Sequence, residues 1–147
     1  MIKIGMMIAD RYEVLEKIGT GGMSDVYKAK DHKLNRFVAV KVLKQEFSEN
    51  ANFVSKFRIE AQAAAGLMHP NIVNVYEFFE ENHTAYIAME FLEGMSYKQY
   101  IAACKGRVPV DVAVNVVLSV LDALKEIHKV KIIHRDVSPD NIFMVPV

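Results

Sequence analysis

The chain has 147 residues, enough for one domain of ordinary size, and its 18 Lys and Arg residues balance 18 Asp and Glu residues. This zero net charge argues against a nucleic-acid partner, which would require a clustered basic excess. The single cysteine, Cys104, excludes a disulfide framework and indicates a reducing, cytoplasmic compartment. The apolar residues 1–9 are too few for a signal-peptide core or a membrane segment.

The first half of the chain predicts an antiparallel sheet with one inserted helix. Five segments have the composition or alternation of strands: residues 12–18, 25–30, 37–43, 72–79 and 85–91. In the third segment, Val38, Val40 and Val42 alternate with residues of the opposite face. Lys41 therefore lies in mid-strand, with apolar neighbours on its own face.

Residues 52–68 predict an amphipathic helix with one apolar stripe, formed by Phe53, Phe57, Ala64 and Leu67. Glu60 falls in the middle of this stripe. A carboxylate facing a core costs several kcal/mol unless it is paired. We therefore predict an ion pair between Lys41 and Glu60. The alternative is that Glu60 reaches solvent at the edge of the helix.

The chain after Gly94 is predominantly helical, with a short helix at residues 97–104 and a long one at 110–129. The apolar side of the long helix is wide enough to need more than one packing partner. The residues that follow are too few to supply them. We therefore expect part of a larger domain, with an exposed apolar surface through which chains could self-associate.

Residues 133–141, Ile-His-Arg-Asp-Val-Ser-Pro-Asp-Asn, form a polar segment between two apolar runs. A regular helix is excluded, because Pro139 lacks an N–H and pushes Ser138 out of the helical region. The segment carries a carboxylate, Asp136, and an amide, Asn141. It is either a functional loop on a rigid scaffold or a polar turn between two short strands.

Residues 19–26, Gly-Thr-Gly-Gly-Met-Ser-Asp-Val, form a glycine-rich loop. Glycines allow the backbone to approach a phosphate and to offer it N–H groups. A dinucleotide-binding fold would place a helix after such a loop and an acidic residue about 20 positions later. Here a strand follows, and the distinctive downstream residue is Lys41. A hairpin turn without a ligand is the other alternative.

Taken together, these elements resemble a eukaryotic-like protein kinase of the bacterial serine/threonine type, over residues 11–144. The resemblance rests on the glycine loop, Val38-Ala39-Val40-Lys41, Phe57-Arg58-Ile59-Glu60-Ala61, His69-Pro70-Asn71-Ile72-Val73, and His134-Arg135-Asp136 with Asn141. It implies an α+β, kinase-like fold. Residues 1–11 would be an N-terminal extension and residues 12–92 a five-stranded N-lobe with one helix and the hinge. Residues 93–147 would begin a helical C-lobe, truncated after the catalytic loop.

The resemblance also implies ATP and Mg²⁺ as ligands. The residues that would bind ATP are Ile18, Gly19, Thr20, Gly21, Gly22, Met23, Ser24, Val26, Ala39, Lys41, Glu60, Met89, Glu90 and Leu92. The glycine loop would cover the phosphates, and Lys41, held by Glu60, would neutralise them. Asp136 would accept the proton of the substrate hydroxyl, and Asn141 would bind Mg²⁺. Lys41, Asp136 and Asn141 would thus be the catalytic residues.

By the same resemblance, the full-length parent would phosphorylate serine and threonine hydroxyls of protein substrates. Two departures from the family pattern affect this expectation. Ser138 stands where such kinases carry a lysine, and the chain stops at Val147, before the Asp-Phe-Gly segment that completes the Mg²⁺ site. This chain alone is therefore expected to be inactive. The alternative function is a nucleotide-binding or scaffolding module without phosphotransfer.

Overall fold

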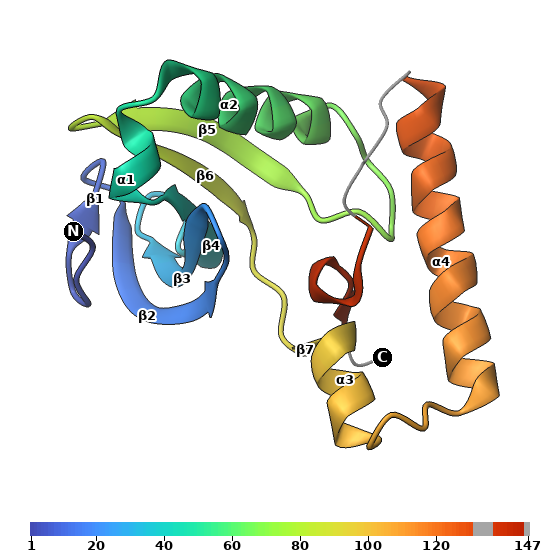
Figure 1. The fold of residues 1–147 in the computed structure, drawn as a ribbon. Helices are drawn as coiled ribbons and strands as arrows, with labels where there is room; N and C mark the ends of the chain where they lie inside the picture. Colours follow the sequence, from blue (N-terminus) through green and yellow to red (C-terminus); the bar gives the residue numbers. More distant parts are fainter. Residues whose placement is uncertain (131–136, 146–147) are drawn as a thin grey trace. The chain divides into compact units, whose positions relative to one another are not determined.

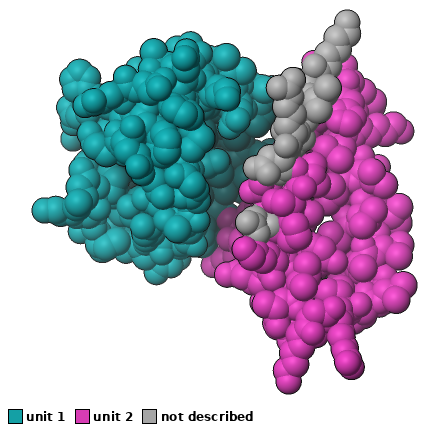
Figure 2. Space-filling model, viewed as in Figure 1, with its two compact units in different colours: residues 1–66, 73–91 teal, residues 67–72, 92–147 magenta. Residues whose placement is uncertain are grey.

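The computed structural model describes residues 1–130 and 137–145 (Figure 1). The chain divides into two compact units (Figure 2). The first contains residues 1–66 and 73–91, and the second contains residues 67–72 and 92–147. Strands dominate the first unit and helices the second, so the predicted α+β class is confirmed.

The first unit is built on a six-stranded antiparallel sheet in the order β1-β2-β3-β4-β6-β5. Its strands are β1 (Met7–Ile8), β2 (Tyr12–Thr20), β3 (Ser24–Asp31), β4 (Arg36–Leu43), β5 (Val75–Glu81) and β6 (Thr84–Glu90). The prediction of five strands was wrong, because β1 has only two residues and shows no alternation. Ile8 pairs with Tyr12 and is fully buried, so the N-terminal segment completes one edge of the sheet.

The two faces of the sheet carry two separate cores. On one face, Val38, Val40 and Val42 join a cluster that also contains the stacked rings of Tyr12, Phe79 and Tyr86. On the other face, Leu43 belongs to the cluster under the helices. The alternation predicted for this strand is therefore confirmed. Burial of these β-branched side chains on a pleated surface supplies much of the stability of the unit.

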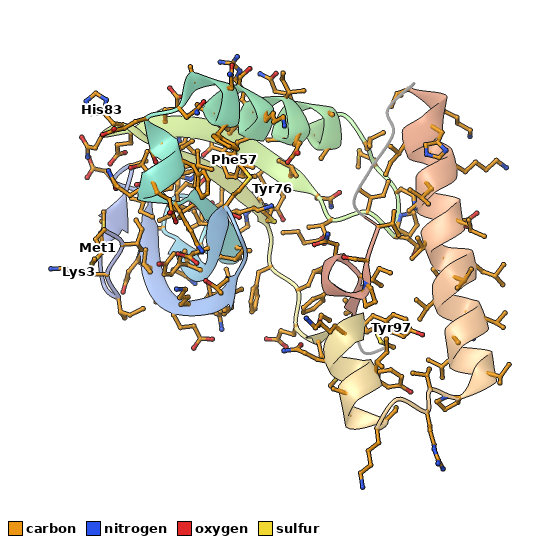
Figure 3. The ribbon with its side chains drawn as sticks, viewed as in Figure 1. Met1, Lys3, Phe57, Tyr76, His83 and Tyr97 are labelled. Atoms are coloured by element: carbon orange, nitrogen blue, oxygen red, sulfur yellow. The ribbon has the colours of Figure 1, made fainter. Side chains whose placement is uncertain are left out.

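Two helices cover the second core, α1 (Gln45–Ser48) and α2 (Ala51–Ala65), and α2 lies along β5 (Figure 1). The side chain of Asn50 caps α2 by accepting a 2.9 Å hydrogen bond from the N–H of Asn52. The helix ends at Ala65, earlier than predicted. Phe57 points from α2 toward the sheet (Figure 3) and packs edge-on against Phe78, with ring centroids 6.3 Å apart.

The second unit contains β7 (Met95–Ser96), α3 (Tyr97–Ala103), α4 (Val110–Lys129), the 3₁₀ turn η1 (Pro139–Asn141) and β8 (Phe143–Met144). β7 pairs with β8, and the N–H of Tyr97 donates to the carbonyl of Ile142 at 2.7 Å. The chain passes so close here that a Cβ on Gly94 would lie 2.0 Å from the carbonyl oxygen of Met144. Only glycine fits this position, where φ is +152°.

The long helix α4 has the predicted bounds and an apolar stripe that other described residues leave half-exposed or more. The stripe consists of Val110, Val114, Val117, Leu118 and Leu121. Its spacing follows one helix face, and an open groove of about 250 Å³ runs along part of it. The expected exposed apolar surface is thus present. In the part of the chain that the structure describes, no helix could cross a bilayer.

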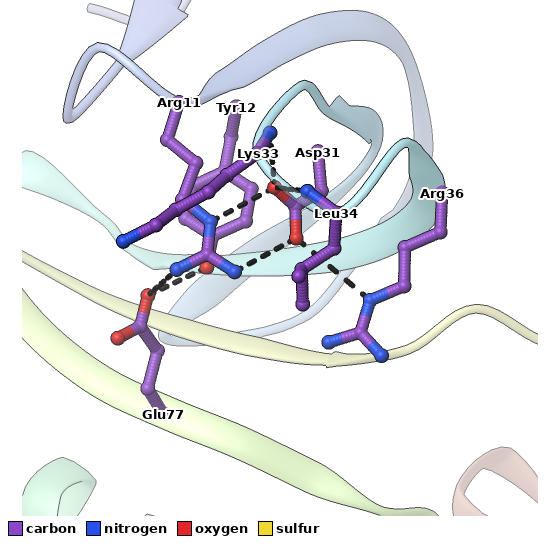
Figure 4. A network of polar contacts seen from close by, with 7 residues as sticks. All are labelled: Arg11, Tyr12, Asp31, Lys33, Leu34, Arg36 and Glu77. Atoms are coloured by element: carbon purple, nitrogen blue, oxygen red, sulfur yellow. Dashed lines mark hydrogen bonds and ion pairs between the residues drawn. The ribbon is translucent and has the colours of Figure 1, made fainter.

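A polar network closes the end of the sheet opposite the glycine loop (Figure 4). Asp31 is completely buried and accepts two hydrogen bonds from the Arg11 guanidinium, at 2.8 and 2.9 Å. It also accepts from the backbone N–H groups of Lys33 and Leu34 in the turn between β3 and β4. Arg36 approaches the same carboxylate at 3.7 Å. One buried charge therefore holds together two strand ends and a turn.

The network extends to β5 through Glu77. The Tyr12 hydroxyl donates to Glu77 at 2.5 Å, and Arg11 lies 3.8 Å from the same oxygen. The hydrogen bonds from Arg11 keep the pKa of Asp31 at about 2, although burial acts in the opposite direction. Burial, followed by the bond to Glu77, raises the pKa of Tyr12 above its usual range. Asp31 is therefore ionised and satisfied inside the fold.

Asp31→Asn is expected to lower the free energy of unfolding by about 3 kcal/mol, because it breaks a buried ion pair. The value lies at the low end of the usual cost, since Arg11 keeps contact with solvent and with Glu77. Urea unfolding measures the change. Asp10→Asn, at an exposed neighbouring position, is the matched control and should change the value by less than about 0.5 kcal/mol. Equal effects of the two substitutions would contradict a structural role for Asp31.

The network also predicts a pH dependence of stability. Because folding lowers the pKa of Asp31 to about 2, the folded state binds fewer protons than the unfolded state between about pH 4 and pH 2. The stabilisation is complete above about pH 4 and is lost as the pH falls toward 2. The difference in unfolding free energy between the unmodified chain and Asp31→Asn should shrink across this range. Urea titrations at about pH 6, 4 and 3 test this, and a constant difference would refute it.

Candidate functional site

One face of the sheet collects most of the predicted site residues in two cross-strand rows. In the first row, Val26 lies between Gly19 and Lys41. In the second, Ala39 lies between Lys28 and Met89. Directly opposed residues share a face, and residues two apart on a strand share it as well. The register therefore brings Gly19, Val26, Ala39, Lys41 and Met89 onto one surface.

The centre of this surface is apolar. Ala39 is 5% exposed and has only a methyl side chain, while its neighbours Val26 and Met89 are half-buried. Because Ala39 is smaller than the residues directly beside it, Lys28 and Met89, its methyl side chain would leave room for a planar group. Lys41 lies one row away, so the same surface offers an apolar platform and, beside it, a cation.

The glycine loop forms the turn between β2 and β3. Ile18, Gly19 and Thr20 end one strand, Ser24 begins the next, and the N–H of Gly21 donates to the carbonyl of Ser24 at 2.8 Å. Neither Gly21 nor Gly22 has a positive φ. A Cβ on Gly22 would meet no described atom within 4 Å. Neither backbone conformation nor internal packing requires glycine there, so the missing side chain leaves space for a ligand close to the backbone.

Asp25 holds the two strands together beside this turn, a role that the sequence did not indicate. The Thr20 hydroxyl donates a short hydrogen bond to Asp25, and Lys17 lies 3.5 Å from the same carboxylate oxygen. The bond from Thr20 lowers the pKa of Asp25. The only signal in the sequence was a hydroxyl and a carboxylate at either side of a glycine turn.

Lys41 and Glu60 do not form the predicted ion pair. Glu60 is exposed, and the Lys41 ammonium lies 6.0 Å from the ring centroid of Phe57. Helix α2 packs through Phe57 and Ala61, so Glu60 stands at the edge of the buried face. The prediction of the pair was wrong, and the alternative, that Glu60 reaches solvent, is correct for this structure.

The predicted hinge begins at the end of β6. The N–H of Glu90 donates to the carbonyl of Asn74 at 2.8 Å, and the N–H of Asn74 donates to the Glu90 side chain at 3.3 Å. Met89 packs against the core under α2. Phe91 is the last residue of the first unit and Leu92 begins the long segment of the second. The chain is therefore tied to Asn74, the residue before β5, just before it leaves the sheet.

The predicted catalytic loop is described only in part, because His134, Arg135 and Asp136 lie outside the described residues. Ser138 is extended, with φ −150° and ψ 161°, as predicted from the proline that follows it. Pro139 opens the 3₁₀ turn, in which the N–H of Asn141 donates to the carbonyl of Ser138 at 3.0 Å. Asn141 is exposed.

Asn141 is the one predicted metal ligand, and it has an amide oxygen suited to a hard cation such as Mg²⁺. Among the described residues, no group of three or more histidine, cysteine or acidic side chains could hold a metal. Asn141 could supply one oxygen ligand to Mg²⁺, and the described residues do not provide the remaining ligands.

The exposed position of Glu60 generates a test of the corrected geometry. Glu60→Gln should change the free energy of unfolding by less than about 0.5 kcal/mol in the chain without nucleotide, because it removes no ion pair. Phe57→Ala, on the buried face of the same helix, should cost about 3–5 kcal/mol and shows that the urea assay detects damage to α2. A loss above about 1 kcal/mol for Glu60→Gln would mean that the pair forms in solution.

Comparisons with known proteins agree on one family. The family model described as the protein kinase domain matches residues 12–146. Serine/threonine-protein kinase PrkC of Bacillus subtilis is 43% identical over 141 residues, which cover 96% of this chain and 22% of that protein. A Clostridium perfringens protein named as a probable serine/threonine-protein kinase is 48% identical over 141 residues, covering 96% of this chain and 20% of its own length.

Among solved structures, the PknI kinase domain of Mycobacterium tuberculosis matches with a TM-score of 0.87 at 29% identity. The match covers 99% of this chain and 58% of that one. The chain thus spans about a fifth of the length of these two curated relatives and less than three-fifths of the solved kinase domain. The matched fold, the glycine loop and the row containing Lys41 all agree with this family. The chain belongs to the protein kinase domain family.

Proposed function

We propose that a protein containing this chain transfers the γ-phosphate of ATP to serine and threonine hydroxyls of protein substrates. The observation that carries the proposal is the sheet register that aligns Gly19, Val26 and Lys41 beside Ala39 and Met89. The names of the relatives, which are serine/threonine kinases, support the same reaction. The reaction is proposed for the cytoplasm, where ATP is supplied and where a lone cysteine stays reduced.

The described residues fit ATP in three respects. The platform around Ala39 suits the flat, apolar adenine ring, with Met89 beside Ala39 and Val26 in the neighbouring row. The open backbone at Gly22 suits phosphate oxygens, which accept hydrogen bonds from N–H groups. The half-buried ammonium of Lys41 would neutralise phosphate charge, and its surroundings strengthen that attraction relative to bulk water.

The remaining roles follow from the family pattern. Asp136 would accept the proton of the substrate hydroxyl and orient that oxygen toward the γ-phosphate. Asn141 would contribute an amide oxygen to Mg²⁺, whose charge supports phosphoryl transfer when the ion is bound with the nucleotide. Glu90 and Leu92 would bind the adenine edge through their backbone groups.

A second function, nucleotide binding without phosphotransfer, is favoured by Ser138. This residue follows the proposed base by two positions, where related kinases carry a lysine. A serine hydroxyl can donate one hydrogen bond to the transferring group but adds no positive charge. ATP binding depends on the sheet and the glycine loop, so it would survive this difference while the transfer step weakened.

The experiment is a phosphotransfer assay with ATP labelled at the γ-phosphate and a protein acceptor rich in serine and threonine. The product of the complete reading frame that contains this chain should label the acceptor. Asp136→Asn should slow labelling at least on the order of 100-fold, because a positioned general base supplies a factor of that size. Lys41→Met should weaken ATP binding. Asp122→Asn, an exposed aspartate on α4, is the matched control and should leave the rate unchanged.

The outcomes separate the two functions. Labelling that Asp136→Asn abolishes supports the kinase. ATP binding with no labelling in the unmodified protein rejects the kinase and supports the nucleotide-binding module. If the protein binds no ATP, both functions are rejected.

A further inference from the structure

The ammonium of Lys28 contacts two aromatic rings near the point where the chain leaves the first unit. Its Nζ lies 4.5 Å from the ring centroid of Phe37 and 4.9 Å from that of Phe91. Both distances are within the range in which a cation is attracted to the face of a ring. Phe37 belongs to β4, and Phe91 is the residue that follows β6.

The position of Phe91 gives this contact its importance. Phe91 directly follows Met89 and Glu90, whose backbone is tied to Asn74, the residue before β5, by the bond from the Glu90 N–H. No residue beyond Glu90 belongs to β6, so the ladder does not hold Phe91. The Lys28 ammonium therefore attaches the first residue after the strand to the sheet.

Lys28 also lies in the row that contains Ala39 and Met89, on the face with the proposed adenine platform. It is therefore at the border between the platform and the departing chain. Its ammonium contacts two aromatic rings, which distinguishes it from an ordinary solvent-exposed lysine. One of these residues, Phe37, is 48% exposed.

The chain supplies a matched control two residues away. Lys30 is on the same strand and the same face, pairs directly with Phe37, and has its Nζ 4.8 Å from the Phe37 ring. Its ring contact in the described structure is with Phe37, whereas that of Lys28 includes Phe91 as well. An effect of substituting Lys28 that the same substitution of Lys30 does not cause can therefore be assigned to the contact with Phe91.

We propose that Lys28 is a positioning residue for nucleotide binding, which acts by holding Phe91 and thereby the backbone of Glu90 to Leu92. This inference rests on the proposed function, because it assigns that backbone to the adenine edge. Lys28 need not touch the nucleotide. Its effect should consequently be the same for adenosine as for ATP, whereas a lysine that attracts phosphates would affect ATP alone.

The test measures the affinities of adenosine and ATP by displacement of a fluorescent ATP analogue. Lys28→Gln should weaken both by about two- to fivefold, the equivalent of one exposed cation–ring contact. Lys28→Arg keeps the cation and should restore the affinity, and Lys30→Gln should change neither. Phe91→Leu should cause the same loss, and adding Lys28→Gln to it should cause no further loss. Equal affinities for Lys28→Gln and the unmodified chain would overturn the inference.

A second measurement does not depend on nucleotide binding. Amide hydrogen exchange in residues 90–92 should be about two- to fivefold faster in Lys28→Gln than in Lys30→Gln, with exchange in the centre of β4 unchanged. If the unmodified chain binds neither adenosine nor ATP, the proposed function fails, and the exchange result still decides whether Lys28 holds Phe91. Identical exchange in the two variants would overturn the inference. A loss for ATP but not for adenosine would also overturn it, in favour of direct phosphate attraction.

Discussion

The register between β3, β4 and β6 is the constraint on which the candidate site depends. Successive side chains of a strand face opposite sides, so a slip of one residue in β4 would exchange its two faces. Lys41 would enter the core of the opposite face, and Val40, which is fully buried, would leave it. Burying an unpaired ammonium costs several kcal/mol. The alternation that builds the core therefore also fixes the site.

The buried carboxylate of Asp31 stabilises this register at the strand pair next to the turn between β3 and β4. Asp31 pairs with Arg36 at the start of the β3–β4 ladder and with Tyr12 at the start of the β2–β3 ladder. Its bonds to two N–H groups of the turn define how the chain reverses between β3 and β4. The bidentate contact with Arg11 anchors the strand that leads to the glycine loop. The Asp31 carboxylate, at the end of the sheet opposite the glycine loop, thus helps to set which residues lie on the face of the candidate site.

Local patterns predicted those elements whose signals are periodic. The valine alternation placed Lys41 correctly on its face, the bounds of α4 followed from its apolar period, and the backbone of Ser138 followed from Pro139. The two residues of β1 carry no period, which explains why this strand was missed. The contact of Lys28 with Phe91 was also inaccessible, because it depends on the path of the chain after β6.

The error at Glu60 has a specific cause. The predicted apolar stripe ran from Phe53 to Leu67, and Glu60 lay midway between them. In the structure α2 ends at Ala65, so Leu67 does not belong to it, and Phe53 packs edge-on against Phe47 of α1 instead. The buried residues of α2 are Phe57 and Ala61, so the centre of its buried face does not include Glu60.

The pairing of β7 with β8 has a consequence for synthesis on the ribosome. The sheet of the first unit has all its strands once β6 has emerged, so this unit can fold while the chain is still growing. The second unit differs, because β7 begins it and must wait for β8, which follows both of its helices. Until then the carbonyl of Met144 has not arrived opposite Gly94, and the second unit lacks the strand pair that joins its beginning to its end. The order of translation therefore gives the two units different exposure to misassembly.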